Sequence, residues 1–203
     1  LNGVSIFMKG ADYIPQDMFL ARPSKQDYEG VIQQATDANM NMLRIWGGGF
    51  FEKDIFYELC DQKGLLIWHD FMFACAMYPG NEAFLNNVRQ ETIDNIKRLR
   101  NHPSIALWCG NNENYIGWKD WKWSKNYSKK DSASLWFDYE KLYHQLLPEV
   151  VEVYDGSRFY WPSSPKYGWG YPVNKDGDVH YWGVWHAKEP FEVFGKKENI
   201  GRF

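Results

Sequence analysis

Short apolar segments alternate with longer amphipathic segments along the 203 residues, and this alternation limits the fold more than any other feature. A strand, a helix and then another strand give parallel pairing, because the helix returns the chain to the same end of the sheet. We expect strands at residues 5–9, 42–46, 65–68, 104–109, 159–162, 178–182 and 200–203, the last of them cut short. The chain is therefore predicted to form a single α/β domain over residues 1–203.

Helix start and stop signals support the same alternation. Ser24 is a favourable N-cap, with Asp27 at the third helical position. Gly64 is expected to end a helix, because glycine readily adopts the left-handed conformation found there. The helices expected on this basis cover residues 24–39, 54–63, 82–100 and 133–154, with a potential break at Pro148.

Polar and aromatic residues gather where the expected strands end. They are Asp12, Arg44 and Trp46, His69 and Asp70, Asn112 and Glu113, Ser163 and Ser164, and His180 and Trp182. A barrel builds its active site from many strand ends, whereas a doubly wound sheet concentrates it at one switch point, commonly with a Gly-rich phosphate loop. The glycines at 47–49 lack the spacing of such a loop. We therefore predict a TIM (β/α)8 barrel, truncated after about six to seven strands.

Composition narrows the possible ligands. Aromatic residues make up 18% of the chain and often lie beside polar residues, which suits the C–H faces of a sugar, although large rings also fill cores. The net charge of −3 favours neither nucleic acid nor an anionic membrane as a partner. No apolar run approaches the roughly 20 residues that span a bilayer. The three cysteines lack framework or zinc-site spacing and are expected to be buried thiols.

Glu113 is the candidate for acid/base chemistry, because it follows an apolar strand and has several aromatic residues nearby in sequence. Glycosidic bonds break through an oxocarbenium-like transition state that two carboxyl groups usually manage. One of them must stay protonated near neutral pH, and apolar crowding raises the pKa of a carboxyl. Asn112 is a neutral donor suited to a sugar hydroxyl. From these residues alone, the alternative that Glu113 is an ordinary loop carboxylate with no catalytic role stays open.

The segment WCGNNEN, residues 108–114, carries a resemblance to a known family. It resembles the Asn-Glu motif at the fourth strand of glycoside hydrolase family 2, in its β-mannosidase branch. Residues 9–15, 41–49, 67–75 and 177–186 resemble the family's segments around the first, second, third and sixth strands. Because these matches occur in family order over nearly the whole chain, their joint specificity is high.

The resemblance implies a retaining β-glycosidase acting on terminal β-linked sugars, chiefly β-D-mannosides, by a two-carboxylate double displacement. Glu113 would protonate the leaving group and then activate water, and Asn112 would bond the sugar 2-hydroxyl. The other substrate-binding positions that it implies are Arg44, Trp46, Asp70, Trp182 and Trp185. For Asp70, a buried ion pair with Arg44 is an equally weighted alternative, and either Trp182 or Trp185 could belong to the barrel wall.

The resemblance also implies parts that this sequence lacks. Family members carry a glutamate nucleophile at the end of the seventh strand, which the match places beyond residue 203. Glu189, Glu192 and Glu198 precede that strand and are not assigned to the role. We therefore expect the isolated chain to be inactive and to need the rest of its own polypeptide, which completes the barrel and supplies the family's β-sandwich domains. No targeting segment is recognised before Leu1, so periplasmic, secreted and lysosomal locations all stay open.

Three alternatives remain. An α/β enzyme could use Asp70 with His69 or His180 as a metal or nucleophilic site, but neighbours on a strand point to opposite faces. A carbohydrate-binding protein would bind sugar without turnover, although such modules are commonly all-β. Within the family, β-galactosidase or β-glucuronidase activity is the alternative, and segments 44–49 and 182–185 favour the β-mannosidase branch. The two-carboxylate mechanism implies no metal or organic cofactor.

Overall fold

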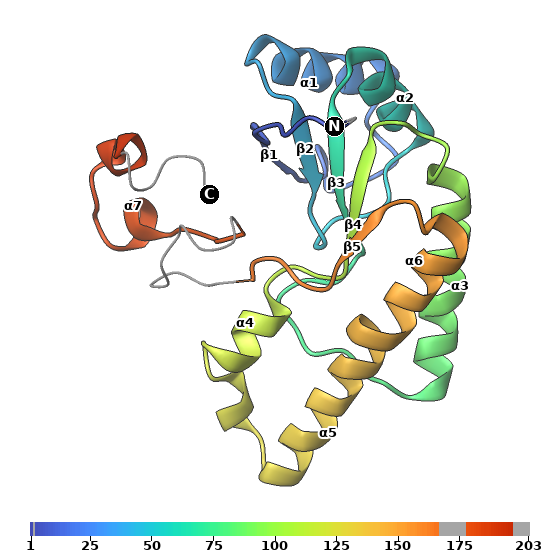
Figure 1. Cartoon of the computed structure of the whole chain (residues 1–203), viewed down its shortest axis with the longest axis vertical. Coiled ribbons are helices and arrows are strands. Elements are labelled where there is room, and N and C mark those ends of the chain that lie inside the picture. The colour runs from blue at the N-terminus through green and yellow to red at the C-terminus, as the bar shows by residue number, and fades with distance from the viewer. Residues whose placement is uncertain (2, 167–177, 197–203) are drawn as a thin grey trace.

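The computed structural model describes residues 1, 3–166 and 178–196. Within this part of the chain, five strands form one parallel sheet in the order β1-β2-β3-β4-β5 (Figure 1). The strands are Gly10–Tyr13 (β1), Met42–Ile45 (β2), Leu66–Asp70 (β3), Ile105–Cys109 (β4) and Phe159–Trp161 (β5). Each strand is joined to its neighbour in the sheet through helix, so the predicted parallel α/β arrangement is confirmed for these residues.

Local signals set the helix boundaries. The helices are Lys25–Asp37 (α1), Asp54–Lys63 (α2), Glu82–Leu99 (α3), Asn114–Lys119 (α4), Lys129–Glu140 (α5), Leu147–Asp155 (α6) and Gly183–His186 (α7). Short 3-10 segments lie at Trp123–Asn126 and Phe191–Gly195. The Ser24 N–H donates to the Asp27 carboxylate at 2.7 Å, and the Ser24 hydroxyl accepts from the Asp27 N–H. Gly64 ends α2 with a left-handed φ of 71°, so both predicted signals are confirmed.

The helix predicted at residues 133–154 begins earlier and is not broken. Ser128 starts it at Lys129, because its hydroxyl accepts a hydrogen bond from the Asp131 N–H at 3.1 Å. A π-helical segment, Lys141–Leu146, then joins α5 to α6. A proline inside an α-helix lacks a donor and collides with the carbonyl four residues earlier. The wider π turn directly before Pro148 relieves both problems, so the helix widens where a break was expected.

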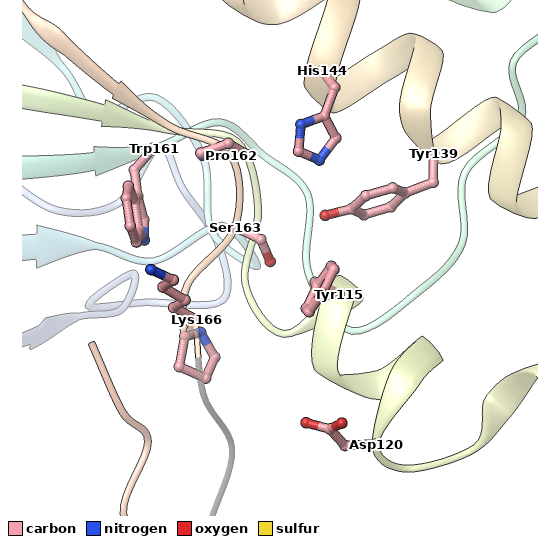
Figure 2. Close-up of a pocket in the computed structure, with 9 residues that line it drawn as sticks. Tyr115, Asp120, Tyr139, His144, Trp161, Pro162, Ser163 and Lys166 are labelled. Carbon is pink, nitrogen blue, oxygen red and sulfur yellow. The ribbon is translucent and has the colours of Figure 1, made fainter. Parts of the chain in front are cut away.

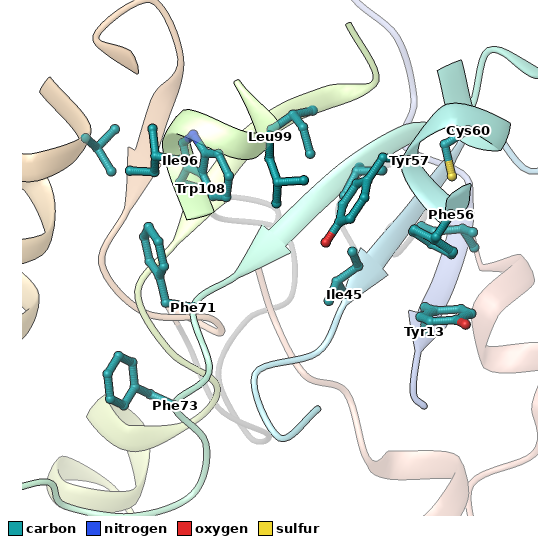
Figure 3. Packing of buried hydrophobic residues seen from close by; sticks show 14 of the residues in the cluster. Tyr13, Ile45, Phe56, Tyr57, Cys60, Phe71, Phe73, Ile96, Leu99 and Trp108 are labelled. Carbon is teal, nitrogen blue, oxygen red and sulfur yellow. The ribbon is translucent and has the colours of Figure 1, made fainter. Parts of the chain in front are cut away.

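The apolar core lies on one face of the sheet (Figure 3). Strand alternation directs Leu43 and Ile45 toward this core and Arg44 toward the opposite face. Core residues labelled in Figure 3 are Tyr13, Ile45, Phe56, Tyr57, Cys60, Phe71, Phe73, Ile96, Leu99 and Trp108. Helices α1, α2, α3 and α6 all contribute to the same cluster, so they all cover this face.

The opposite face of the sheet is polar and partly open. Arg44 of β2 pairs in register with Trp68 of β3, and both side chains point to this face. A cavity of about 370 Å³ lies over it, between the first strands and residues 178–180. Its lining includes Asp12, Arg44 and His180. The sheet therefore has an apolar face covered by helices and a polar face, with an open cavity, that gathers charged groups.

The first strand lies at Gly10–Tyr13 rather than at residues 5–9, which are exposed. Asn41 accounts for the shift. Its side chain accepts from the Lys9 N–H at 2.8 Å and donates to the Phe7 carbonyl at 2.9 Å. Because the Asn41 side chain binds these two backbone groups, which a neighbouring strand would otherwise bind, strand pairing with β2 begins only at Gly10 and Met42.

The predicted strand at residues 178–182 is also wrong. Within it only Val179 takes part in a β-bridge, and the chain enters α7 at Gly183. Asp178 explains how the segment is held. Its carboxylate accepts hydrogen bonds at 2.6 to 2.9 Å from Trp161, Ser164 and Lys166, so a side chain replaces a backbone ladder. The strand predicted at residues 200–203 lies outside the described residues.

Two further sequence expectations can be compared with the fold. Cys60 and Cys109 are buried as predicted, whereas Cys75 is exposed. The difference arises because Cys75 lies in the loop after β3, with a left-handed φ of 51°, rather than in a helix or strand of the core. Across the described ranges, no helix has both the length and the apolar character needed to cross a membrane.

Candidate active site

Side chains from three successive strands and one later segment meet at the carboxyl edge of the sheet. Arg44 lies in β2, Asp70 ends β3, Asn112 and Glu113 follow β4, and His180 comes from the segment before α7. Hydrogen bonds connect Arg44 to Asp70, Asn112 and His180, and His180 to Glu113. The structure thus brings together four of the sequence-predicted site residues and adds His180.

Arg44 and Asp70 form a buried ion pair. Nη2 of Arg44 donates to Oδ2 of Asp70 at 2.8 Å, and Nε donates to Oδ1 at 3.2 Å. The Asp70 side chain is 0% exposed and also accepts from the Gly47 N–H at 3.0 Å and from Nε1 of Trp68 at 2.9 Å. Burial raises the pKa of Asp70, and the charge of Arg44 and these hydrogen bonds oppose the rise. The structural alternative for Asp70, pairing with Arg44, is therefore present.

The same guanidinium orients Asn112. Nη2 of Arg44 lies 3.1 Å from Oδ1 of Asn112, and because arginine has no acceptor, the amide oxygen must face it. The amide nitrogen then lies 3.4 Å from the Cys75 sulfur. Backbone bridges to Ala74 and Ser164 hold Asn112 between the ends of β3 and β5. Its amide N–H group is therefore a donor of fixed direction.

Glu113 occupies a sharp turn between β4 and α4. Its φ of 65° is left-handed, which is uncommon for a residue with a Cβ, and its N–H donates to the Ser164 carbonyl at 2.7 Å. Oε1 lies 2.7 Å from Nδ1 of His180, and Oε2 lies 3.5 Å from the Cys75 sulfur. The side chain is 12% exposed, so the carboxylate is largely enclosed but still reaches solvent.

The protonation of Glu113 differs from the sequence-based expectation. Burial raises its pKa, but the hydrogen bond from His180, with smaller effects from Cys75 and Arg44, holds the pKa below its usual value. Trp108, one of the aromatic residues near Glu113 in the sequence, packs in the core against Phe71 instead of against the carboxyl. Its Nε1 donates to Asp155 at 2.8 Å. The predicted apolar crowding is therefore outweighed by polar partners.

A cavity of about 290 Å³ opens beside Glu113. Its lining residues are Glu113, Ile116, Trp121, His180, Trp182 and His186. The Trp182 ring is 4.9 Å from that of His186 and is 39% exposed. Trp185 is 68% exposed and does not line this cavity. Of the two tryptophans predicted in this region, the structure brings Trp182 to Glu113.

Trp46 braces the turn after β2. Its ring covers Gly48, where an added Cβ would lie 2.0 Å from the ring carbons. The backbone N–H of Trp46 donates to the Tyr13 carbonyl at 3.2 Å. A β-carbon at Gly47 would likewise lie 2.4 Å from the Phe73 carbonyl oxygen, so the turn that supports Asp70 requires glycine there.

A separate, aromatic cavity of about 450 Å³ lies between β5 and helices α4 and α5 (Figure 2). Figure 2 shows Tyr115, Tyr139 and Trp161 around it, together with Ser163. Ser163 donates to Asn111, whereas the adjacent Ser164 donates to Asp178. Successive residues of an extended segment point to opposite sides, so Ser163 faces this cavity and Ser164 faces the Arg44 side. Glu113 does not line it.

His69 belongs to the core rather than to the site. It is 0% exposed, stacks with Phe51 and Tyr57, and its Nε2 lies 2.9 Å from the Tyr57 hydroxyl. Burial lowers its pKa to about 3. Asp70, its neighbour, faces Arg44, so the two residues point apart as expected for a strand. In the ranges that the structure describes, no group of three His, Cys, Asp or Glu residues is arranged to hold a metal ion.

Two residues around Glu113 were not placed there from the sequence. From the sequence, His180 was named among the polar residues at the strand ends and, with Asp70, as a metal or nucleophilic site, but not as a partner of Glu113; Cys75 was expected to be a buried thiol. For His180 a usable signal exists: it stands in the family-like segment at 177–186, two residues before Trp182. For Cys75 the signal is its place after β3 at the same sheet edge as Asn112.

Comparison with known proteins gives several close relatives, although no model of a protein family matches the chain. β-Mannosidase B of Thermothelomyces thermophilus is 38% identical over 100% of this chain, and β-mannosidase of Capra hircus is 42% identical over 90% of it. Among solved structures, β-D-mannosidase of Dictyoglomus thermophilum has a TM-score of 0.81 and 46% identity over 100% of this chain. The chain spans only 22 to 24% of the length of these proteins.

The fold thus matches part of the catalytic domain of glycoside hydrolase family 2. Along its whole length the chain is homologous to proteins named β-mannosidases. The family resemblance drawn from the sequence segments is confirmed.

Proposed function

We propose that this chain supplies the acid/base carboxylate of a retaining β-glycosidase whose preferred substrates are terminal β-D-mannosides. The observation that carries the proposal is the position of Glu113 at the carboxyl edge of the sheet, beside Asn112 and in one cavity with Trp182. Identities of 38 to 46% to proteins named β-mannosidases support the choice of sugar.

The sheet, in this proposal, is part of a (β/α)8 barrel. Helices α1, α2, α3 and α6 cover one face, as the outer ring of a barrel does, while the polar face corresponds to the barrel interior. Strands β1 and β5 are the edges of the described sheet. The remaining strands would come from the rest of the polypeptide, because unpaired strand edges and an open core are unfavourable.

Glu113 acts first as an acid and then as a base. Its proton passes to the glycosidic oxygen while the bond from C1 to that oxygen breaks and a nucleophilic carboxylate bonds to C1. In the second step the Glu113 carboxylate takes a proton from water, which attacks C1 and releases the nucleophile. The acid form needs a higher pKa than the polar partners of Glu113 favour, and a second ionised carboxylate nearby would raise it.

That second carboxylate is assigned to none of the late glutamates of this chain. Glu189 accepts a hydrogen bond from the Tyr181 hydroxyl, Glu192 is exposed, and Glu198 lies outside the described residues. We place the nucleophile elsewhere in the whole protein, so that residues 1–203 alone should lack activity.

Substrate binding follows from the fixed donors and rings around Glu113. The amide N–H of Asn112 would donate to the 2-hydroxyl of the sugar, and Arg44 keeps that amide oriented. Trp182 would offer a ring face inside the Glu113 cavity. Asp70 and Trp46 would act chiefly by holding Arg44 and the turn after β2, and Trp185 would contact sugar beyond the cavity.

The test uses the complete protein and 4-nitrophenyl glycosides of mannose, galactose and glucuronic acid in the β-configuration. We expect preference for the mannoside and a loss of about 10²–10⁴-fold in Glu113→Ala on a substrate with an unactivated leaving group. Azide should partly restore turnover of the activated substrate by this variant, because a small anion can attack the glycosyl-enzyme without a general base. Glu192→Ala, at an exposed position, is the matched control.

Each other outcome is informative. A Glu113→Ala variant as active as the wild type would show that Glu113 is an ordinary loop carboxylate. Preference for the galactoside or the glucuronide would change the sugar and leave the mechanism intact. Sugar binding with no turnover of any substrate would favour a carbohydrate-binding protein instead.

A further inference from the structure

His180 connects the buried ion pair to Glu113. One ring nitrogen, Nε2, lies 3.0 Å from Nη1 of Arg44, and the other, Nδ1, lies 2.7 Å from Oε1 of Glu113. The side chain is 21% exposed, and the adjacent Val179 is buried and held by a β-bridge. The imidazole is therefore fixed at both nitrogens, by Arg44 from β2 and by Glu113 from the turn after β4.

These two contacts determine the tautomer of the ring. Arginine can only donate, so Nε2 must carry the lone pair that accepts from Arg44. The proton of a neutral imidazole then resides on Nδ1, which donates it to Glu113. An imidazolium would place two N–H donors face to face at Arg44, so the geometry describes the neutral ring.

We propose that His180 is a positioning residue for Glu113: Arg44 sets its tautomer, and its Nδ1–H then holds Oε1 of Glu113, so that Oε2 is the oxygen that exchanges the proton with the substrate. This inference rests on the glycosidase function proposed above. Among the residues that the structure describes, Oε2 accepts one hydrogen bond, the long one from the Cys75 thiol at 3.5 Å. The fixed oxygen and the exchanging oxygen are thereby distinguished.

The hydrogen bond favours the ionised form of Glu113, because it is donated to the carboxylate. Losing it should raise the pKa of Glu113, and the alkaline limb of kcat/KM, where the acid loses its proton, should move to higher pH. Within the described part of the chain, the other titratable or charged groups facing Glu113 are Cys75 from the loop after β3, Arg44 from β2 and His186 from α7. All three side chains are retained in a His180 variant.

Two amide substitutions separate the two halves of the ring. In His180→Asn the amide nitrogen replaces Nδ1, so the donor to Glu113 is kept and the contact with Arg44 is lost. In His180→Gln the longer amide reaches the position of Nε2, so the contact with Arg44 is kept and the donor to Glu113 is lost. The two variants have similar polarity, and a difference between them reports on the Glu113 hydrogen bond.

The experiment measures the pH dependence of kcat/KM for the complete protein on a β-mannosyl disaccharide, whose sugar leaving group needs protonation. We expect the alkaline limb of His180→Gln to rise by about one pH unit and that of His180→Asn to stay near the wild type. Unfolding temperatures of both variants, measured alongside, identify a loss that comes from misfolding.

The inference would be overturned if the alkaline limb of kcat/KM lay at the same pH in the wild type and both variants, or if it moved by the same amount in both variants. Either result would leave the proposed glycosidase function standing. A wild type that cleaves no β-glycoside, or one whose activity does not depend on Glu113, would overturn the proposed function itself. A variant that does not fold is replaced by His180→Ser, where exogenous imidazole should restore the wild-type limb if the contact with Glu113 is responsible.

Discussion

The guanidinium of Arg44 donates two hydrogen bonds, at 2.8 and 3.2 Å, to the fully buried carboxylate of Asp70. Its remaining N–H groups contact Asn112 and His180. Asp70 is in turn held by the Gly47 N–H and the Trp68 indole. One cation thus sets the direction of the groups on both sides of it. The planar guanidinium group suits this role, because its N–H groups point in several fixed directions.

Arg44→Lys should therefore cost both stability and activity. Lysine offers a single ammonium and cannot make the two parallel bonds, so the buried Asp70 would lose part of its compensation. We expect a loss of about 2 kcal/mol or more in unfolding free energy, measured by thermal unfolding of the complete protein. The exposed Arg22→Lys is the control and should leave the unfolding temperature unchanged. An unchanged transition in Arg44→Lys would contradict a structural role for the pair.

Tyr28→Phe should destabilise the fold more at pH 7 than at pH 4. The Tyr28 hydroxyl donates to the buried carboxylate of Glu52 at 2.7 Å. Burial raises the pKa of Glu52 above 4.5 in the folded protein. As pH rises from 4.5, Glu52 therefore loses its proton in the unfolded chain first, and the free energy of unfolding falls until Glu52 is also ionised in the folded protein. Removing the Tyr28 hydroxyl raises the pKa of Glu52 in the folded protein further. At neutral pH, where Glu52 is ionised, this lowers the free energy of unfolding by about a further 1–2 kcal/mol.

Amide hydrogen exchange of residues 25–37 at the two pH values measures this difference locally. Tyr127→Phe, at an exposed tyrosine, is the control. Equal acceleration of exchange by Tyr28→Phe at both pH values would mean that the charge of Glu52 is not involved.

Cys75 should be the thiol that iodoacetamide modifies in the native protein, because Cys60 and Cys109 are buried. Burial and the charge of Glu113 raise the pKa of Cys75, so its modification should be slow at pH 7 and speed up toward pH 9 and above. Peptide mass spectrometry of the labelled protein identifies the site. Modification should also reduce glycosidase activity, since the sulfur lies 3.5 Å from Oε2 of Glu113, and Cys75→Ser should resist this inactivation. Labelling of Cys109 at an equal rate would contradict the packing around β4.

Trp182→Ala should lower kcat/KM by about tenfold or more, because the ring lines the Glu113 cavity. Trp185→Ala should have a smaller effect, because that ring is 68% exposed and lies outside the cavity. Initial rates on a β-mannosyl disaccharide compare the two variants directly. A larger loss in Trp185→Ala would show that the sugar is bound outside this cavity.

Local signals in the sequence were sufficient for many boundaries of the fold. The capping box at Ser24 and the left-handed Gly64 depend on interactions within a few residues, and both are found as predicted. The first strand was misplaced because Asn41, more than 30 residues away, replaces its ladder with side-chain hydrogen bonds. The strand expected at residues 178–182 is absent because Asp178 binds the end of β5 with its side chain.

The sequence by itself determined the parallel α/β arrangement, the helix caps, the family and the candidacy of Glu113, because apolar periodicity and motifs are properties of neighbouring residues. Only the tertiary structure decided that Arg44 holds Asp70, that His180 bonds Glu113 from 67 residues away, and that Cys75 lies beside them. It also decided the direction of the Glu113 pKa shift. The physical reason is that hydrogen bonds and electrostatic effects depend on distances between side chains, which chain folding sets and sequence spacing does not.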